Sequence, residues 1–366
     1  MISPVSISLP AHAATASSDP LQARALSQLH AFTNWLEANN VKGYIGEVGW
    51  PSSPQWNSLA DAWYQSADEN DLWVTGWATG EWWGTSYPLS SYVASSGRSV
   101  DTARPQASVI EQHATDASYL RGVNVAGGEF AAPSAAATSS FSNSNPGTYG
   151  VDYHYDSQAT FDYLASRGIK LVRIPFRWER LQPRLGRPLD SDELARLKAV
   201  VKRAGDAGLK VVLDLHNYGA YYLSNGTEGV RRAIGTPQVP IWRFAEIWGR
   251  ISNNFKKNPA VAGYGLMNEP WGLPSVKGRT PVEEWQAASQ AAVDRIRRNG
   301  DHTLITVAGY NWSGVQRWPQ IQPAAWIHDP TGNFRYEAHA YWDADNSGTY
   351  GLSYEQEVAV AEASGY

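Results

Sequence analysis

The chain has 366 residues, of which 43% are hydrophobic and 18% are charged, proportions typical of a soluble globular protein. Its formal net charge is -5 and no cluster of Lys and Arg exceeds a pair, which argues against nucleic acid or an anionic membrane as a partner. There is no cysteine, which excludes disulfides and thiolate metal sites. No apolar run approaches the roughly 20 residues that a membrane-spanning helix needs.

Residues 1–18 read as a leader that precedes the folded part. Ala11-His12-Ala13 follows a short apolar stretch and has the small-x-small pattern of a signal-peptidase site. The basic segment that normally opens an export signal is missing. The sequence therefore predicts either a truncated export signal or a disordered leader.

The next elements alternate between helix and strand. Asp19 as N-cap and Pro20 at the first helical position predict a helix over 20–38. The strand "VKGYIGEVGW" (41–50) follows, then a helix with apolar residues at helical spacing over 56–67, then the strand "DLWVTGW" (71–77). These are two strand–helix units.

A polar connector, 95–118, contains a short helical pattern at 105–113 and leads into the strand "YLRGVNVAGGEF" (119–130). Residues 131–150 are rich in Ala, Ser and Asn. Because the strand–helix alternation resumes beyond them, we interpret this segment as a mobile loop and not as a domain linker.

The remaining pattern is regular. Helices are predicted at 157–167, 192–207 and 241–255, and capping boxes at 280–283 and 353–356 open two more. The strands between them read "IKLVRIP", "LKVVLDLHN", "VAGYGLMNEP", "TLITVAG" and "FRYEAHAYW". Eight strands alternating with helices predict a (β/α)8 TIM barrel. The alternative, a doubly wound open sheet, would need a Gly-rich turn after its first strand, and no GxGxxG is present.

Polar and aromatic residues close nearly every predicted strand. In a (β/α)8 barrel the carboxyl ends of the strands meet at one face, where the active site lies. Buried polar groups are least costly when they satisfy one another, so convergence in one site is expected. The chain also contains 17 Trp and 19 Tyr, and flat aromatic rings with a polar edge stack well on sugars. The residues at the strand ends are Glu47, Trp77, Asn124, Arg173, His216, Asn217, Asn268, Glu269, Asn311, Trp312, His339 and Tyr341.

Together, "YIGEVGW", "WATGEWWG", "LVRIP", "DLHN", "GLMNEP" and "EAHAYWDADNSGTY" resemble the motif set of glycoside hydrolase family 5. Within that family they most resemble secreted endo-β-1,4-glucanases. The resemblance covers roughly residues 21–366, and the motifs are specific as a set although each one alone is weak.

The motifs occur in a different order from that of the family. The segment with the nucleophile-type glutamate and the final Trp comes first here. We therefore expect a circularly permuted barrel over 19–366, with the family's seventh and eighth units at 19–94, the connector at 95–118 and the first to sixth units at 119–366. A closed ring has no first strand, so neighbours are unchanged by such a permutation. The alternative is a fragment that spans two tandem barrels.

The resemblance implies a retaining mechanism with Glu47 as nucleophile and Glu269 as general acid/base. It also implies that Arg173 and Tyr341 donate hydrogen bonds to Glu47 and that Asn268 binds the sugar 2-hydroxyl. The full set of expected substrate-binding residues is Arg173, His216, Asn217, Asn268, His339, Tyr341, Trp77, Trp82, Trp83, Trp271 and Trp312. Neither His216 nor His339 has metal-ligand spacing to another histidine, and no metal or cofactor is expected.

The expected function is therefore a secreted, monomeric endo-β-1,4-glucanase that acts on a β-glucan polysaccharide or oligosaccharide. Two alternatives remain open from the sequence. One is the same chemistry on another β-glycan, either β-mannan or mixed-linkage glucan. The other is a non-catalytic carbohydrate-binding barrel.

Overall fold

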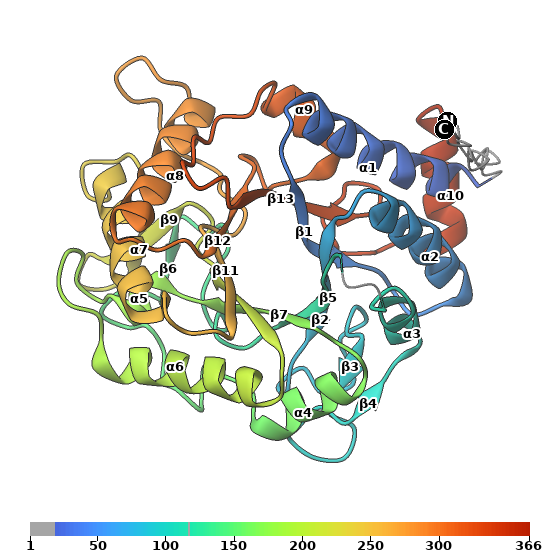
Figure 1. Cartoon of the computed structure of the whole chain (residues 1–366), viewed down its shortest axis with the longest axis horizontal. Helices are drawn as coiled ribbons and strands as arrows, with labels where there is room; N and C mark the ends of the chain where they lie inside the picture. The colour runs from blue at the N-terminus through green and yellow to red at the C-terminus, as the bar shows by residue number, and fades with distance from the viewer. Residues whose placement is uncertain (1–18, 116–117) are drawn as a thin grey trace, which may run out of the picture.

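The computed structural model describes residues 19–115 and 118–366. At its centre, parallel strands form a ring that is surrounded by helices (Figure 1). The predicted leader, residues 1–18, lies outside the described residues. In chain order the ring is made of β1 (Gly43–Gly49), β2 (Trp73–Thr79), β5 (Arg121–Val125), β7 (Leu171–Phe176), β8 (Lys210–Leu215), β11 (Val261–Gly265), β12 (Leu304–Ala308) and β13 (Phe334–Tyr341).

The ring closes at β1, which pairs in parallel with β2 on one side and with β13, the last strand, on the other. Every other strand of the ring lies beside its predecessor in the chain. The predicted (β/α)8 barrel is therefore confirmed. Counted from β5, β1 and β2 take the seventh and eighth places of the ring. The circular permutation itself stays a prediction.

The helices begin where the sequence provides caps. The Asp19 carboxylate accepts hydrogen bonds from the backbone N–H groups of Leu21 and Gln22, and both predicted capping boxes form, at Thr280 and at Ser353. The helices are α1 (Pro20–Ala38), α2 (Pro54–Glu69), α3 (Pro105–Gln112), α4 (Gln158–Ser166), α5 (Trp178–Leu181), α6 (Ser191–Asp206), α7 (Ile241–Phe255), α8 (Pro281–Arg298), α9 (Trp318–Ile321) and α10 (Tyr354–Ala363), with the 3-10 turn η1 (Val315–Arg317).

The segment 131–150 differs from the mobile loop that its composition predicts. Its β6 (Thr138–Ser139) pairs antiparallel with β10 (Gly229–Ala233), which in turn pairs with β9 (Ala220–Ser224). Phe141 is buried beside this small sheet. Because the partner strand lies about 90 residues later in the chain, local composition could not reveal the pairing. In the connector, β4 (Thr102–Ala103) pairs with β3 (Tyr92–Val93) ahead of α3.

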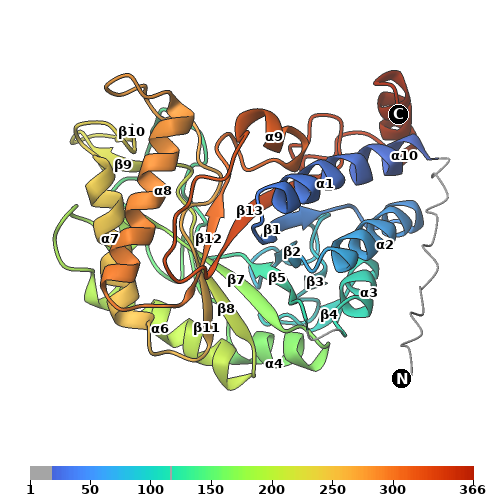
Figure 2. The same cartoon turned by 45° about the horizontal axis from the view of Figure 1, so that its top comes forward.

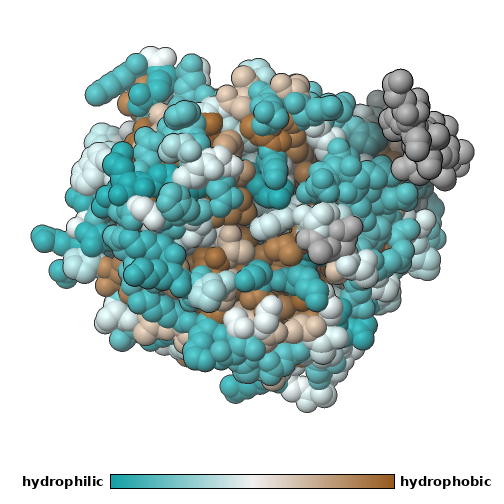
Figure 3. All heavy atoms as spheres, viewed as in Figure 1, coloured by the Kyte–Doolittle hydropathy of each residue, from teal (hydrophilic) through white to brown (hydrophobic). Residues whose placement is uncertain are grey.

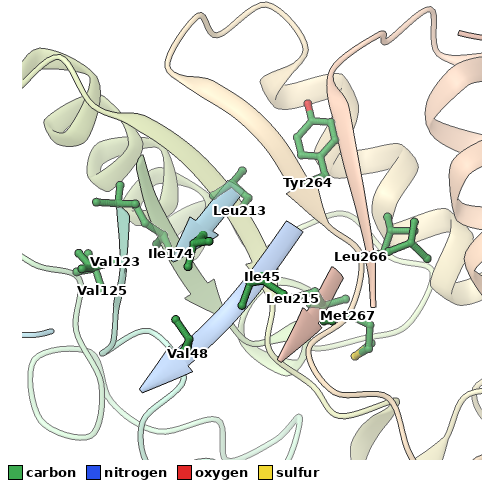
Figure 4. Packing of buried hydrophobic residues seen from close by; sticks show 14 of the residues in the cluster. Ile45, Val48, Val123, Val125, Ile174, Leu213, Leu215, Tyr264, Leu266 and Met267 are labelled. Atoms are coloured by element: carbon green, nitrogen blue, oxygen red, sulfur yellow. The ribbon is translucent and has the colours of Figure 1, made fainter. Parts of the chain in front are cut away.

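Alternation along the strands separates packing residues from site residues. Leu213 and Leu215 of β8 are fully buried in the main hydrophobic cluster, together with Ile174 of β7 (Figure 4). Successive side chains of a strand point to opposite faces. Asp214 therefore points into the barrel, where it forms an ion pair with Arg173. A single strand such as β8 thus contributes apolar side chains to the hydrophobic core and polar side chains to the barrel interior.

The outer helices pack in neighbouring pairs. Figure 2 shows α7 beside α8 on one side of the barrel and α1 beside α10 on the other. The Tyr354 hydroxyl of α10 donates a 2.5 Å hydrogen bond to the Asp19 carboxylate at the start of α1. Polar residues cover most of the rim in Figure 3, and hydrophobic residues gather near the middle of that face. In the described part of the chain, no helix has both the length and the hydrophobicity needed to cross a bilayer.

Candidate active site

Glu47 lies on β1 with its side chain almost completely buried, at 4% exposure. Its two carboxylate oxygens accept hydrogen bonds from different residues: Arg173 Nη1 donates to Oε1 at 3.1 Å, and the Tyr341 hydroxyl donates to Oε2 at 2.8 Å. Burial, together with the charge of Glu47, raises the pKa of Tyr341 well above its usual range, so the phenol keeps the proton that it donates. These two donors fix the orientation of the Glu47 carboxylate.

Glu269 follows β11 and turns back toward Glu47. Its φ of 43° lies in the left-handed region, a conformation that costs about 1–2 kcal/mol for a residue other than glycine and that recurs at active sites. His339 Nδ1 lies 2.8 Å from Glu269 Oε1. Burial, and next to it the charge of Glu47, raises the pKa of Glu269, although the hydrogen bond to His339 opposes this. Glu269 is thus the carboxyl group of the pair that is held toward its protonated form.

The two carboxyl groups are close in space although they are far apart in the chain. One oxygen of Glu47, one oxygen of Glu269 and a ring nitrogen of His339 all lie within 4.8 Å of one another. His339 connects the two, because it is directly paired with Glu47 in the register of β1 and β13 and its Nδ1 lies 2.8 Å from Glu269 Oε1. The early and the late glutamate therefore belong to one site.

Arg173 is the centre of the charge network beneath this pair. It is fully buried and lies 3.1 Å from Glu47, 3.0 Å from Asp214 and 3.0 Å from Glu337. Burial alone would lower the pKa of Arg173, but the three acids raise it well above its ordinary value. The network therefore keeps a permanent positive charge beside Glu47.

Sequence reasoning did not identify Glu337 as a member of this site. It lies two residues before His339 on β13, so both side chains are on the same face of the strand. That period-two spacing was the available signal. A Cβ on Gly46 would lie 2.2 Å from Glu337 Oε1, so the strand beside it needs a glycine at this position to admit the buried carboxylate.

His216 is neutral in this arrangement. Asp214 Oδ2 lies 2.6 Å from its Nδ1, and Asn268 Nδ2 lies 3.2 Å from its Nε2. Burial lowers the pKa of His216 to about 4. Its Nδ1 therefore carries the proton, and its Nε2 accepts from the Tyr218 hydroxyl at 3.0 Å and from the Asn268 amide. Asn268 is in turn anchored by Arg173, which donates to its Oδ1 at 2.7 Å.

His339 is charged, in contrast to His216. Burial would lower its pKa, but the charge of Glu47 and the hydrogen bonds to Glu269 and Glu337 raise that pKa from the ordinary 6.5 to about 10. An imidazolium beside two glutamates stabilises the negative charge of the site. It also links the protonation of His339 to the stability of the fold.

This linkage predicts a pH-dependent effect of replacing His339 by Asn. Because the folded-state pKa lies above the unfolded-state value, the stabilisation is fully present below about pH 6.5 and is lost as the pH rises toward about 10. The decrease in the free energy of unfolding caused by His339→Asn should therefore be largest near pH 6 and shrink steadily above about pH 7. Urea unfolding of both proteins across this range measures it. A difference that stays constant or grows with pH would contradict the charged state of His339.

The substrate-binding role predicted for Asn217 is not supported by its position. Its Nδ2 donates to both carboxylate oxygens of Glu179 and to the Ala220 carbonyl, and its Oδ1 accepts from the Trp178 backbone. Asn217 is completely buried. The Asn217 side chain points away from the barrel interior, whereas that of its neighbour His216 contacts Asp214 inside it. Asn217 therefore holds the loop after β8.

Three of the predicted aromatic residues lie on β2 or just after it: Trp77 is part of the strand, and Trp82 and Trp83 follow it. The Trp77 ring stacks against His216 with 6.0 Å between centroids, and its Nε1 donates to the Tyr87 hydroxyl. Trp83 packs edge-on against Trp77 at 5.8 Å and is half-buried. Trp82 is 39% exposed. Of the three, Trp77 lies nearest the charge network.

On the other side of the site, Trp271 and Trp312 stack in parallel at 5.1 Å with an interplanar angle of 13°. Trp312 is 36% exposed. A cleft of about 670 Å³ opens here, and its walls include Tyr218, Glu269, Trp312, Arg317, His339 and Tyr341. By contrast, Trp342 is buried and stacks on Trp50 at 5.6 Å, so it belongs to the core.

The distances among Glu47, Glu269 and His339 would also suit a metal ion. The charges do not favour one, however. Arg173 lies against Glu47 and the raised pKa keeps His339 protonated, so both residues would repel a cation. The chemistry that the arrangement supports is that of two carboxyl groups, one oriented by hydrogen-bond donors and one held toward its protonated form.

Known proteins match about two thirds of this chain. The profile of the cellulase family, glycosyl hydrolase family 5, matches residues 124–364, which begin within β5 and leave out β1 and β2. The manganese dependent endoglucanase Eg5A of Phanerodontia chrysosporium is 32% identical over 238 residues. Those residues are 63% of this chain, and the match spans only 55% of that relative's length.

Solved structures of endoglucanases also resemble this chain. The endoglucanase Cel5A of Pseudomonas stutzeri, in complex with cellobiose, is 39% identical with a TM-score of 0.53, covering 63% of this chain and 62% of that one. XacCel5A, in complex with cellopentaose, is 33% identical with a TM-score of 0.53, covering 65% of this chain and 72% of that one. Since the family profile extends over well more than half of the chain, this protein belongs to glycosyl hydrolase family 5, the cellulase family.

Proposed function

We propose that the chain is a retaining endo-β-1,4-glucanase that hydrolyses β-1,4-glucan, with Glu47 as the nucleophile and Glu269 as the general acid/base. One observation carries this proposal: an oxygen of Glu47 and an oxygen of Glu269 lie within 4.8 Å of each other. Carboxyl groups about 5–5.5 Å apart are typical of retaining glycosidases, whereas inverting enzymes keep them about 6.5–9.5 Å apart to admit a water molecule.

In the first step the Glu47 carboxylate attacks the anomeric carbon of the sugar, and the bond from that carbon to the glycosidic oxygen breaks. Glu269 gives its proton to the departing oxygen, which leaves as the hydroxyl of the released chain. The raised pKa of Glu269 fits a group that must be protonated beside a charged neighbour. The product of this step is a glycosyl ester on Glu47.

In the second step a water molecule takes the place of the released chain. Glu269, now a carboxylate, removes a proton from the water as the water oxygen attacks the anomeric carbon. The ester bond breaks, and Glu47 leaves as a carboxylate. Two inversions at one carbon restore the β configuration. Arg173 and Tyr341 stabilise the charge that returns to Glu47.

Neighbouring side chains would bind the sugar during both steps. Asn268 Nδ2 has two hydrogens, and the contact with His216 uses one of them, so the second can bind the sugar 2-hydroxyl. Trp77 would form the platform under the sugar that is cleaved, with Trp82 and Trp83 beyond it. Trp271 and Trp312 would contact the chain on the opposite side of the cleavage point.

The substrate class is supported by the relatives, which are named endoglucanases. The test is the release of reducing ends from carboxymethylcellulose and from galactomannan, followed by NMR of the first anomer formed. We expect activity on the first polymer and initial formation of the β-anomer. Activity on galactomannan alone would shift the proposal to a mannanase. An initial α-anomer would contradict the retaining mechanism, and no activity on either polymer would favour a non-catalytic binding barrel.

We propose further that the protein works outside the cytoplasm as a monomer. Polymeric glucan cannot cross a membrane, so the enzyme must meet it outside. All the side chains assigned to the reaction come from one chain. Activity recovered only from the cytoplasm, or activity that falls on dilution below a dimer's dissociation constant, would contradict these two proposals.

A further inference from the structure

A second cluster of ligand-type side chains lies apart from the catalytic pair. Glu81 follows β2, and His154 and Asp156 precede α4. Potential ligand atoms of these three residues all lie within 4.8 Å of one another. His154 and Asp156 are buried, at 5% and 1% exposure, and Glu81 is half-exposed. The cluster therefore joins two segments of the chain and remains open to solvent on one side.

The hydrogen bonds of this cluster leave buried atoms without partners. Asp156 Oδ1 contacts His154 Nε2 at 2.7 Å, but Asp156 Oδ2 has no hydrogen-bond partner among the described residues. Oδ2 belongs to the carboxyl group that His154 contacts, so it lies within the cluster. His154 Nδ1 is also buried and unpartnered, but it lies beside Gly127 and not toward Asp156, so Asp156 Oδ2 is the atom that matters for a ligand. A buried polar atom without a partner costs roughly 1–3 kcal/mol, which calls for a further bound group.

Glu81 contributes an anchored carboxylate. Its Oε1 accepts hydrogen bonds from the Ser157 backbone N–H at 2.8 Å, from Ser157 Oγ at 2.5 Å and from Thr160 Oγ1 at 2.6 Å. All three contacts use the same oxygen. The Glu81 carboxylate is thus fixed at the start of α4, and its second oxygen is available for a ligand on the solvent side.

We propose that Glu81, His154 and Asp156 bind a divalent transition-metal cation such as Mn²⁺ or Zn²⁺. One imidazole and two carboxylates are a donor set that such ions accept. Ligand atoms held about 2.1 Å from one ion are roughly 3–4.2 Å from each other. Spacings near the 4.8 Å limit would therefore contract, and the 2.7 Å contact between His154 Nε2 and Asp156 Oδ1 would widen slightly. Unlike the catalytic pair, the three side chains of this cluster form no ion pair with an arginine of the described residues, and Arg203 donates only to the backbone carbonyls of Asp156 and Tyr155.

The metal would act on substrate binding through Trp82. The Trp82 ring stacks on the His154 ring with 4.1 Å between centroids and an interplanar angle of 21°, and Trp82 is the neighbour of Glu81 in the chain. Fixing His154 and Glu81 would therefore fix the exposed Trp82 ring. This consequence rests on the proposed role of Trp82 as a sugar platform, whereas metal binding itself does not.

The chain offers a matched control cluster. His113 also lies between two carboxylates, Asp61 and Asp68, but both of its ring nitrogens are partnered, at 3.1 Å and 2.5 Å. In addition, Arg121 forms an ion pair with Asp68. The control cluster also has one histidine and two carboxylates, but both ring nitrogens of its histidine are hydrogen-bonded and an arginine already neutralises one carboxylate.

The test is isothermal titration of metal-stripped full-length protein with Mn²⁺ and, separately, with Zn²⁺. We expect one ion per chain, with the dissociation constant raised at least tenfold in Glu81→Gln and in Asp156→Asn and unchanged in Asp61→Asn. Glu81→Gln keeps an oxygen that can accept from Ser157 and Thr160, so it should retain the fold, and circular dichroism checks both variants. If Asp156→Asn fails to fold, Glu81→Gln decides the outcome alone.

Titration of Glu47→Gln separates this site from the catalytic one. The proposal expects its metal binding to equal that of the parent protein. Binding that is lost in Glu47→Gln but kept in Glu81→Gln would overturn the proposal, as would no binding of either ion to the parent protein. The added metal should also lower KM for cello-oligosaccharides several-fold, but not in Trp82→Ala. An unchanged KM would overturn the link to Trp82.

Discussion

Replacing Glu47 by Ala is expected to lower kcat by about 10³-fold or more, which corresponds to about 4 kcal/mol in the activation barrier. Without the carboxylate, no glycosyl ester can form. Arg173 also loses its ion pair with Glu47. Arg173 still pairs with Asp214 and Glu337, so the barrel should persist with reduced stability. Initial rates on cello-oligosaccharides and a thermal unfolding curve separate these two effects.

Added azide should restore part of the activity of Glu47→Ala. This rescue would show that the variant lacks the nucleophile. Azide can enter the space left by the carboxylate and attack the anomeric carbon from the same face. The product would be an α-glycosyl azide. Glu362→Ala, an exposed glutamate of α10, is the control and should match the parent rate. A Glu47→Ala protein with the parent rate would remove Glu47 from the mechanism.

Replacing Glu269 by Ala should have an effect that depends on the leaving group. Loss of a general acid/base typically lowers the rate by about 10²–10⁴-fold. We expect that loss on cello-oligosaccharides, whose departing alkoxide needs a proton. On aryl glycosides with strongly acidic phenols the first step should be largely retained. The glycosyl ester would then accumulate, visible as a burst of released phenol.

Azide also distinguishes the acid/base role of Glu269 from the nucleophile role of Glu47. In Glu269→Ala it should attack the glycosyl ester from the face that water uses and give a β-glycosyl azide, the opposite anomer to that from Glu47→Ala. The pH profile should change as well. Because burial raises the pKa of Glu269, we expect the activity of the parent protein to fall once the pH exceeds that pKa, and the variant should lack this alkaline limb. An equal loss on every substrate would contradict the acid/base role.

Much of the fold could be predicted because its signals are local. Asp19, Thr280 and Ser353 cap helices as their sequence patterns indicate. Alternation of short apolar strands with helices led to the barrel. Ring closure then brings β1 beside β13. The pairing of β6 with β10 was missed because it depends on a distant strand and not on the composition of residues 131–150.

The limits of prediction in the site have two physical origins, the directions of adjacent side chains and contacts between distant strands. His216 and Tyr341 face the interior, whereas their neighbours Asn217 and Trp342 pack elsewhere. Motifs alone do not tell which of two adjacent polar or aromatic residues faces inward. Glu337 was missed for the complementary reason: its role depends on the charge of Arg173, contributed by a strand on the far side of the ring.

The central claim is that Glu47 and Glu269 act on one sugar and that Glu47 is the residue that bonds to it. The most direct test is mass spectrometry of peptides from protein treated with a 2-deoxy-2-fluoro cellobiosyl fluoride, whose fluorine at C2 slows breakdown of the glycosyl ester. We expect a single label on the peptide that contains residues 43–51, and no label in Glu47→Ala. A label on the Glu269 peptide, or on any other carboxylate, would contradict it.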